Sequence, residues 1–167
     1  HGSFIDDETV RLFKQTGAYL VPTMLAFDSV IKQGRAGERP PASVAKAEEV
    51  ATAVKESHRR AAKGGVKIAF GTDSGVGPHG INGQEFALMQ EVGISPAAAI
   101  RSATVDAAAL LGRSDRVGRI APGMDADIIA VAGDPIEDVR RLETVDFVMH
   151  RGMVHKLGGQ PQPLQPK

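Results

Sequence analysis

The segment Phe70–Gly75 places a single carboxylate directly after a short apolar run. That run, Val66–Gly71, is typical of a strand covered on both faces in a parallel sheet, which predicts Asp73 at its carboxyl end. Barrel and open-sheet enzymes carry their catalytic groups at this end of their strands. Asp73 is therefore a candidate metal ligand or general base, and the alternative is that it only caps the following turn.

Two histidines are placed where they could act together with Asp73. His1 precedes a Gly-Ser-Phe loop and a predicted helix, so it would also follow a strand, although an isolated histidine is more often structural. His79 follows Asp73 on a loop rich in glycine and proline. From such a loop it could bind a substrate or move a proton, or it could simply face solvent.

The other three histidines carry no comparable signal. His58 lies between a serine and two arginines on a polar helix face, so we expect it to be solvated, like the other charged residues of 46–63. His150 and His155 lie far along the chain, and their spacing does not match a helical zinc-binding pair.

Composition limits the chemistry that is possible. With 167 residues the chain can form one domain with a core, and its net charge of zero favours neither nucleic acid nor an anionic membrane as a partner. There is no cysteine, so any metal must be held by histidine and carboxylate. No apolar run reaches the ~18 residues that span a bilayer, and no signal peptide is recognisable. Because the sequence begins with His1, we expect upstream residues, and the cellular location stays undetermined.

Helices and strands are predicted to alternate in the first two thirds of the chain. Apolar periodicity, capping residues and glycine stops mark the boundaries, and 24–41 is expected to be a long irregular loop. The predicted helices are 6–17, 43–63, 84–92, 95–102 and 104–111, and the predicted strands are 18–23 and 66–71.

The pattern changes after Gly118. We expect a strand at 127–131, a loop with a short helix at 135–142, and a hairpin whose strands, 145–150 and 153–156, flank Arg151-Gly152. The tail 158–167 is rich in proline and glutamine and is predicted to be disordered.

This order of elements predicts an α/β fold with parallel βαβ units. Only two complete parallel strands are present, together with the strand that His1 would end. Such a sheet has unpaired edges and apolar faces that nothing in the chain covers. The sequence therefore predicts part of a larger architecture.

Several motifs in this order resemble the amidohydrolase superfamily, over residues 1–157. The start His-Gly-Ser-Phe-Ile-Asp-Asp and the segment Leu20–Thr23 are most similar to its imidazolonepropionase-like branch, which includes Xaa-Pro dipeptidases. The other motifs are Gly71–Gly75 with Pro78–Gly80, Ser95–Pro96, Ala99–Ile100 with Ser102–Thr104, Ala107–Gly112 and Val117–Asp127.

The resemblance implies the C-terminal half of the family's fold. Residues 1–116 would form about strands six to eight of a (β/α)8 TIM barrel with their helices. Residues 117–157 would form part of a small β-sandwich domain, and 158–167 the disordered tail. The missing N-terminal half of the barrel would be the main partner, the complete protein is expected to form a homo-oligomer, and this chain alone is expected to be inactive.

The resemblance also implies a metal site with one or two divalent ions, usually zinc. By position, His1 would be the sixth-strand ligand, and Asp73 would be the eighth-strand ligand and the catalytic base. His79 and Thr23 are assigned to the substrate. The family's His-x-His pair, carboxylated lysine and fifth-strand histidine have no counterpart here, and a catalytic zinc needs three protein ligands plus water.

The function so implied is hydrolysis of an amide bond, of a dipeptide or an N-acyl amino acid, by a metal-activated water. A deaminase or a cyclic-amide hydrolase on the same barrel is an open alternative, because substrate choice depends on loops largely absent here. A third possibility is a truncated half-barrel without catalytic activity.

Overall fold

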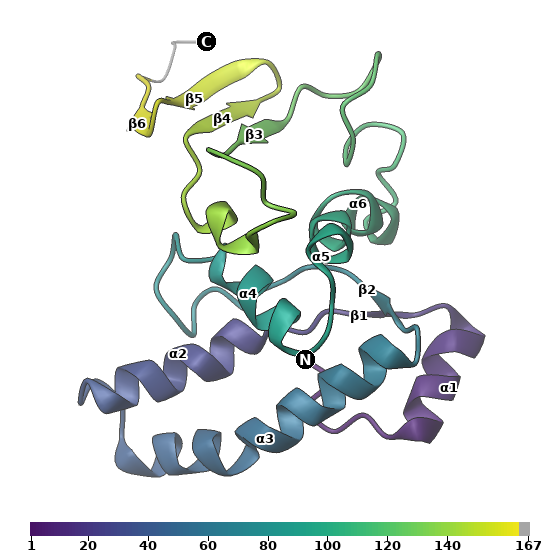
Figure 1. Cartoon of the computed structure of the whole chain (residues 1–167), viewed down its shortest axis with the longest axis vertical. Helices are drawn as coiled ribbons and strands as arrows, with labels where there is room; N and C mark the ends of the chain where they lie inside the picture. The colour runs from purple at the N-terminus through teal and green to yellow at the C-terminus, as the bar shows by residue number, and fades with distance from the viewer. Residues whose placement is uncertain (164–167) are drawn as a thin grey trace.

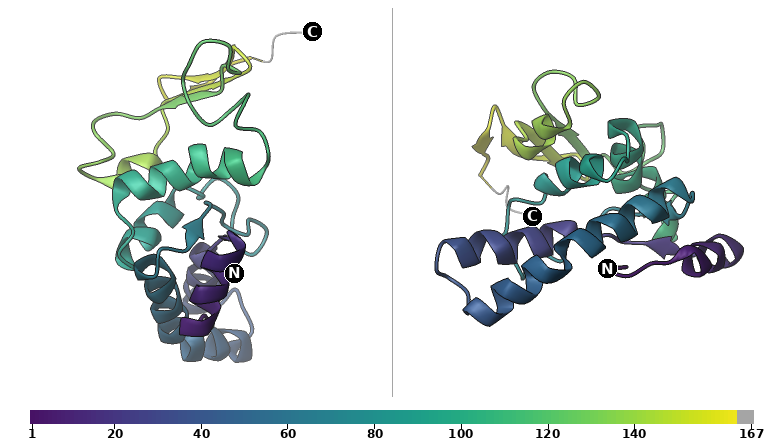
Figure 2. Two further views of the ribbon diagram at one scale, coloured as in Figure 1. Left: turned by 90° about the vertical axis from the view of Figure 1, so that its right-hand side faces the viewer. Right: turned by 60° about the horizontal axis from the view of Figure 1, so that its bottom comes forward.

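The computed structural model describes residues 1–163, which form a helical part around a two-stranded parallel sheet, followed by a four-stranded antiparallel sheet (Figure 1). Figure 2 shows the antiparallel sheet on the far side of α4–α6 from α1–α3. In order, the elements are α1 (Asp7–Thr16), β1 (Tyr19–Leu20), α2 (Met24–Arg35), α3 (Pro41–Lys63), β2 (Lys67–Ile68), α4 (Gln84–Glu91), α5 (Pro96–Ala103), α6 (Val105–Leu110), β3 (Ile128–Ala130), η1 (Val139–Glu143), β4 (Phe147–His150), β5 (Met153–Leu157) and β6 (Gln160–Pro161).

The two strands β1 and β2 pair in parallel, with Tyr19 opposite Lys67 and Leu20 opposite Ile68. The pairing continues past the strands, because the Ala69 amide donates to the Leu20 carbonyl at 3.0 Å. The predicted βαβ connection is therefore confirmed, although the regular strands are shorter than the apolar runs that predicted them.

Local capping signals set several helix boundaries as predicted. The Asp6 carboxylate accepts from the Thr9 amide at 2.8 Å at the start of α1, and Gly17 ends that helix with φ 69°. Ser95 caps α5 in the same way, and Pro96 occupies its first position. The predicted helices α1, α4, α5 and α6 are all present.

The predicted loop at 24–41 is wrong, because Met24–Arg35 is helix α2. Its apolar residues Met24, Phe27 and Ile31 follow helical spacing and line the space against α3. Gly34 has no side chain, and a Cβ there would collide with Val44 of α3. The glycines and arginines that suggested a loop therefore mark the end of α2 and its close packing against α3 (Figures 1 and 2).

Two apolar clusters hold the helices to the parallel sheet. The first joins α1 and α3 to β1 and includes Ile5, Val10 and Leu20. The second joins α2, α4 and α5 and includes Met24 and Met89, with the stacked rings of Phe70 and Phe86 beside it at a centroid distance of 4.4 Å. Leu20 of the first cluster pairs with Ile68, which packs against the second, so both clusters lie on the same face of the sheet. The opposite face carries the half-buried Tyr19 and the exposed Lys67.

The antiparallel sheet has the order β3-β4-β5-β6. The predicted hairpin is confirmed, with Arg151 and Gly152 in its turn at φ 48° and 78°. Disorder from residue 158 onward is wrong as far as 163, because Gln160–Pro161 pairs with β5 as strand β6. The end of the predicted tail, 164–167, lies outside the described residues. Within 1–163, no helix is long and apolar enough to cross a membrane.

His58 is buried at 1% exposure, so its predicted solvation is wrong. Its Nδ1 lies 2.7 Å from the Val54 carbonyl and its Nε2 lies 2.8 Å from the His1 carbonyl. Burial lowers the pKa of His58, and the bond to the Val54 carbonyl offsets this effect only in part. The N-terminal loop covers the side of α3 that carries His58. The polar residues next to His58 in the sequence gave no sign of this long-range contact.

We expect His58→Ala to lower the free energy of unfolding by roughly 2–4 kcal/mol, because it leaves a cavity and removes the bond to the His1 carbonyl. Urea-induced unfolding measures this loss. His155→Ala, on the partly exposed strand β5, is the control and should change stability by less than about 1 kcal/mol. Equal effects of the two substitutions would contradict the structural role of His58.

Candidate active site

The two residues predicted as metal ligands lie together at the carboxyl end of the parallel sheet. His1 Nε2 lies 3.7 Å from Asp73 Oδ2, and the two side chains are 57% and 44% exposed. Asp73 follows β2, while His1 reaches the same edge of the sheet from the N-terminal loop. An imidazole nitrogen and a carboxylate oxygen therefore face one open space at the end of the strands where catalytic groups are expected.

Thr23 lies beside this pair, between β1 and α2. It is 5% exposed, its φ is 53°, and its hydroxyl is hydrogen-bonded to His1 Nδ1. With Nδ1 occupied in this way, the other ring nitrogen of His1 is the one directed at Asp73. The assignment of Thr23 to the substrate stays a prediction, and its hydroxyl is bound to His1 in this structure.

Asp73 has an unusual backbone conformation, with φ 52°. A non-glycine residue in the left-handed region is uncommon and needs support from its surroundings. The hydroxyls of Thr72 and Ser74 lie 3.0 Å apart, and Asn82 Nδ2 donates to both, at 3.1 and 2.9 Å. These bonds tie the residues on either side of Asp73 to the end of the loop.

His79 lies on the loop that follows Asp73, as predicted, and its side chain is exposed. Its role at the substrate stays a prediction. Of the two remaining histidines, His150 contacts Asp127, with Nδ1 2.9 Å from Oδ1, in the antiparallel sheet.

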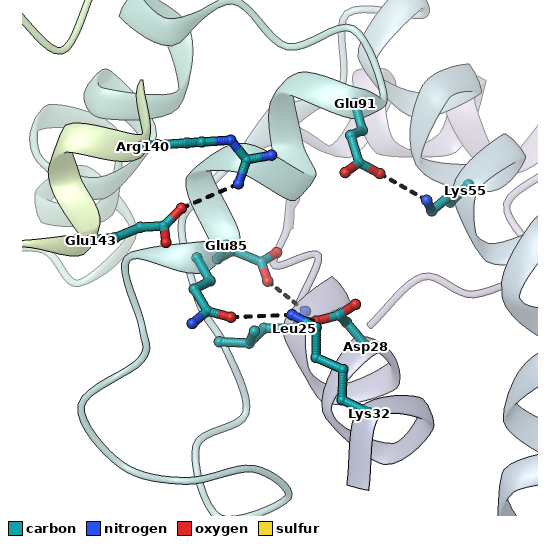
Figure 3. A network of polar contacts seen from close by, with 9 residues as sticks. Leu25, Asp28, Lys32, Lys55, Glu85, Glu91, Arg140 and Glu143 are labelled. Carbon is teal, nitrogen blue, oxygen red and sulfur yellow. Dashed lines mark hydrogen bonds and ion pairs between the residues drawn. The ribbon is translucent and has the colours of Figure 1, made fainter. Parts of the chain in front are cut away.

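Glu85 is a second carboxylate that the sequence reasoning missed. It is 0% exposed, and its two oxygens accept from the amides of Met24 at 3.0 Å and Leu25 at 2.7 Å (Figure 3). Burial raises the pKa of Glu85 to about 7. The hydrogen bonds from the Leu25 and Met24 amides oppose this rise, whereas the nearby Asp28 charge adds to it. Glu85 thus caps α2, in place of the Thr23 side chain that makes no capping bond.

The rim around Glu85 consists of exposed polar side chains. Lys32 contacts Asp28 at 2.7 Å, and it also donates to the neighbour of Glu85, Gln84, at 3.4 Å (Figure 3). Lys55 and Glu91 pair at 2.7 Å, and Arg140 and Glu143 at 3.4 Å. Surface pairs of this kind contribute little to stability, so the buried carboxylate is the distinctive group here.

The donors at the strand ends suit a divalent metal but do not complete a site. Histidine nitrogen and carboxylate oxygen are usual zinc ligands. Within residues 1–163, however, no group of three or more His, Asp or Glu side chains is placed to hold a metal ion. His1 and Asp73 therefore fit as part of a ligand set, and further ligands would have to come from residues outside this sequence.

The chain is similar to several known proteins. The model of the amidohydrolase family matches residues 1–157. A crystal structure of a Xaa-Pro dipeptidase with methionine in its active site is 43% identical, with a TM-score of 0.86 over 93% of this chain and 39% of that one. A prolidase in complex with N-methylphosphonate-L-proline is 34% identical, with a TM-score of 0.83 over 94% of this chain and 39% of that one.

Ochratoxinase from Aspergillus niger is 30% identical over 151 residues, which are 90% of this chain and 31% of the relative. The crystal structure of that enzyme has a TM-score of 0.72 to this chain. The chain thus spans only about a third of this relative's length, and 39% of the dipeptidase and of the prolidase.

The raised pKa of Glu85 predicts a specific dependence of stability on pH. The folded chain keeps the Glu85 proton up to pH about 7, whereas the unfolded chain releases it near the ordinary value of 4.5. The free energy of unfolding should therefore fall as pH rises between these values, by up to about 3 kcal/mol. Glu85→Gln cannot titrate, so its free energy of unfolding should lack this dependence on pH. The difference in unfolding free energy between wild type and Glu85→Gln should therefore change between pH 4.5 and about 7.

Urea-induced unfolding at pH 5 and pH 8 measures that difference. The control is Glu91→Gln, an exposed carboxylate on the same helix, whose difference from wild type should not vary with pH in this way. A constant difference between wild type and Glu85→Gln at both pH values would mean that Glu85 titrates normally.

Proposed function

The chain belongs to the amidohydrolase family, and from this we propose that the protein containing it hydrolyses an amide bond with a metal-activated water. The substrate would be a dipeptide or an N-acyl amino acid. The observation that carries the proposal is the approach of His1 Nε2 to within 3.7 Å of Asp73 Oδ2 at the ends of parallel strands. The similarity to a dipeptidase and a prolidase supports the substrate class.

The proposal assigns the chain to the C-terminal part of the fold. The strand that His1 would end, β1 and β2 would be strands six, seven and eight of a (β/α)8 barrel, within residues 1–116. Residues 117–157, with the antiparallel sheet, would be part of the β-sandwich domain. The first five strands and the other metal ligands would come from residues outside this sequence, so the chain alone would lack activity.

His1 and Asp73 are the residues of this chain that would hold the metal. A bound zinc would lower the pKa of water and polarise the scissile carbonyl. The Asp73 carboxylate would accept the proton of the attacking water on one oxygen and pass it to the leaving nitrogen. The Asp73 side chain is 44% exposed, so its carboxylate is accessible to water.

The substrate would be bound on the same side of the sheet. His79, on the exposed loop after Asp73, would bind the part of the substrate away from the scissile bond, and Thr23 lies next to His1 at the floor of this space. The roles of these two residues are separable by kinetics, because a contact remote from the reacting atoms affects KM more than kcat.

Asp73→Asn in the complete enzyme should keep the fold and lower kcat by roughly 10²–10⁴, since an amide cannot accept the proton of water. Steady-state kinetics with a dipeptide panel and metal analysis measure this effect. Asp115→Asn, an exposed carboxylate far along the chain, is the control and should retain wild-type kcat. If Asp73→Asn stays within a few-fold of wild type, Asp73 is not the base.

His79→Ala should leave the metal content unchanged and raise KM more than it lowers kcat, because the proposal assigns His79 to the substrate rather than to the metal. Metal analysis and steady-state kinetics test both parts, with His155→Ala as the control for loss of an imidazole elsewhere. Stoichiometric loss of metal from His79→Ala would make His79 a ligand instead.

A further inference from the structure

The turn from Asn82 to Glu85, at the start of α4, contacts the segment that carries Asp73 and the segment whose Thr23 binds His1. The Glu85 amide donates to the Asn82 carbonyl at 3.1 Å, which closes the turn and holds the two side chains in a fixed relation. The Asn82 side chain reaches the segment around Asp73, and the Glu85 side chain reaches the residues that follow Thr23, the partner of His1.

On the Glu85 side, the connection runs through the start of α2. The buried carboxylate takes the amides of Met24 and Leu25, the two residues after Thr23. Threonine at a helix start commonly caps the helix with its own hydroxyl. Because Glu85 does this here, the Thr23 hydroxyl is left for His1 Nδ1, to which it is hydrogen-bonded.

On the Asn82 side, the connection runs through two hydroxyls. Asn82 Nδ2 donates to Thr72 Oγ1 at 3.1 Å and to Ser74 Oγ at 2.9 Å, so it holds the residues on both sides of Asp73. Asp73 has φ 52°, a conformation that such contacts must maintain.

Helix η1 packs against the backbone of the Asn82–Glu85 turn at Gly83. A Cβ on Gly83 would lie 2.8 Å from Glu143 Cα and would also collide with the Leu142 carbonyl, so η1 packs directly against the backbone of the turn. A glycine between Asn82 and Glu85 therefore permits this close contact and leaves the turn little freedom to shift.

We infer that the Asn82–Glu85 turn is the positioning element of the site, with Glu85 orienting His1 through Thr23 and Asn82 orienting Asp73 through Thr72 and Ser74. The inference rests on the proposed function for the assignment of His1 and Asp73 as metal ligands. Partners that orient metal ligands commonly change metal affinity by roughly 10–100-fold when they are removed.

Zinc affinity of the complete protein, measured by competition with a chelator, is the first test. Glu85→Gln keeps the size of the side chain but can accept only one of the two amides, and Asn82→Ala releases both hydroxyls. Each should weaken zinc binding by roughly tenfold or more. Glu91→Gln, on the same helix, and Val92→Ala, which opens a cavity in the nearby core, should both retain wild-type affinity although Val92→Ala lowers stability.

The effects of Glu85 and Asn82 are distinguished by the proton on His1 Nδ1. This proton is observed by NMR in the zinc-loaded protein labelled with ¹⁵N-histidine. This proton should be protected from solvent exchange in wild type and in Thr23→Ser, and exposed in Thr23→Val. Glu85→Gln should also speed its exchange, whereas Asn82→Ala should not, because Asn82 acts on Asp73.

Zinc affinities of Glu85→Gln and Asn82→Ala within twofold of wild type would overturn the inference, and so would an equal loss in Val92→Ala. If the His1 Nδ1 proton exchanged with solvent at the same rate in Thr23→Val as in wild type, Glu85 would not orient His1 through Thr23. A wild-type protein that does not bind zinc through His1 and Asp73 would instead refute the proposed function, so the two failures are distinguishable.

Discussion

The parallel pairing of β1 with β2 determines where Thr23 and Asp73 lie, and the contacts of His1 depend on these two residues. With Leu20 opposite Ile68, the chain leaves both strands at the same edge of the sheet, and Thr23 and Asp73 follow within a few residues. An antiparallel pair would direct these two ends to opposite edges. The pairing in turn requires a crossover helix, which α3 supplies, and apolar cover, which the two core clusters supply on the face that carries Leu20 and Ile68.

Helix α3 does more than connect the strands, because it also holds the N-terminal loop in place. Ser57 Oγ donates to the Gly2 carbonyl at 2.6 Å and accepts from the Ile5 amide at 2.7 Å, and His58 contacts the His1 carbonyl. Ile5 is buried at 4% exposure beneath this loop. His1 is therefore fixed through its backbone by α3 and through its imidazole by Thr23, two contacts from independent elements.

Sequence patterns predicted the elements whose causes are local. Asp6 with Gly17, Ser95 with Pro96, and the Arg151-Gly152 turn are read from neighbouring residues, and the strand-end position of Asp73 follows from one apolar run. The pairing of His1 with Asp73 needed the family resemblance, because the residues alone left His1 ambiguous.

Errors arose where distant residues decide the environment. His58 looks solvated beside its arginines, and it is buried only because residues near His1 fold over it. Helix α2 was mistaken for a loop because its terminal glycine and arginines outweighed the Met24, Phe27, Ile31 spacing. Glu85 could not be identified at all, since its amide partners are about 60 residues away in the chain.

Within residues 1–163, two of the three non-glycine residues with positive φ lie at this one edge of the sheet, and the third is Arg151 in the hairpin turn. Thr23 and Asp73 both have positive φ, which costs a non-glycine residue roughly 1–2 kcal/mol, and Glu85 is a carboxylate without solvent contact. Hydrogen bonds between different segments of the chain offset these costs. Thr23 binds His1, Glu85 binds the Met24 and Leu25 amides, and Asn82 binds the residues on both sides of Asp73. Strain held by the surrounding fold restricts the conformations available to the strand ends. The same contacts that stabilise these residues therefore also restrict how the backbones beside His1 and Asp73 can move, which would favour the proposed metal site.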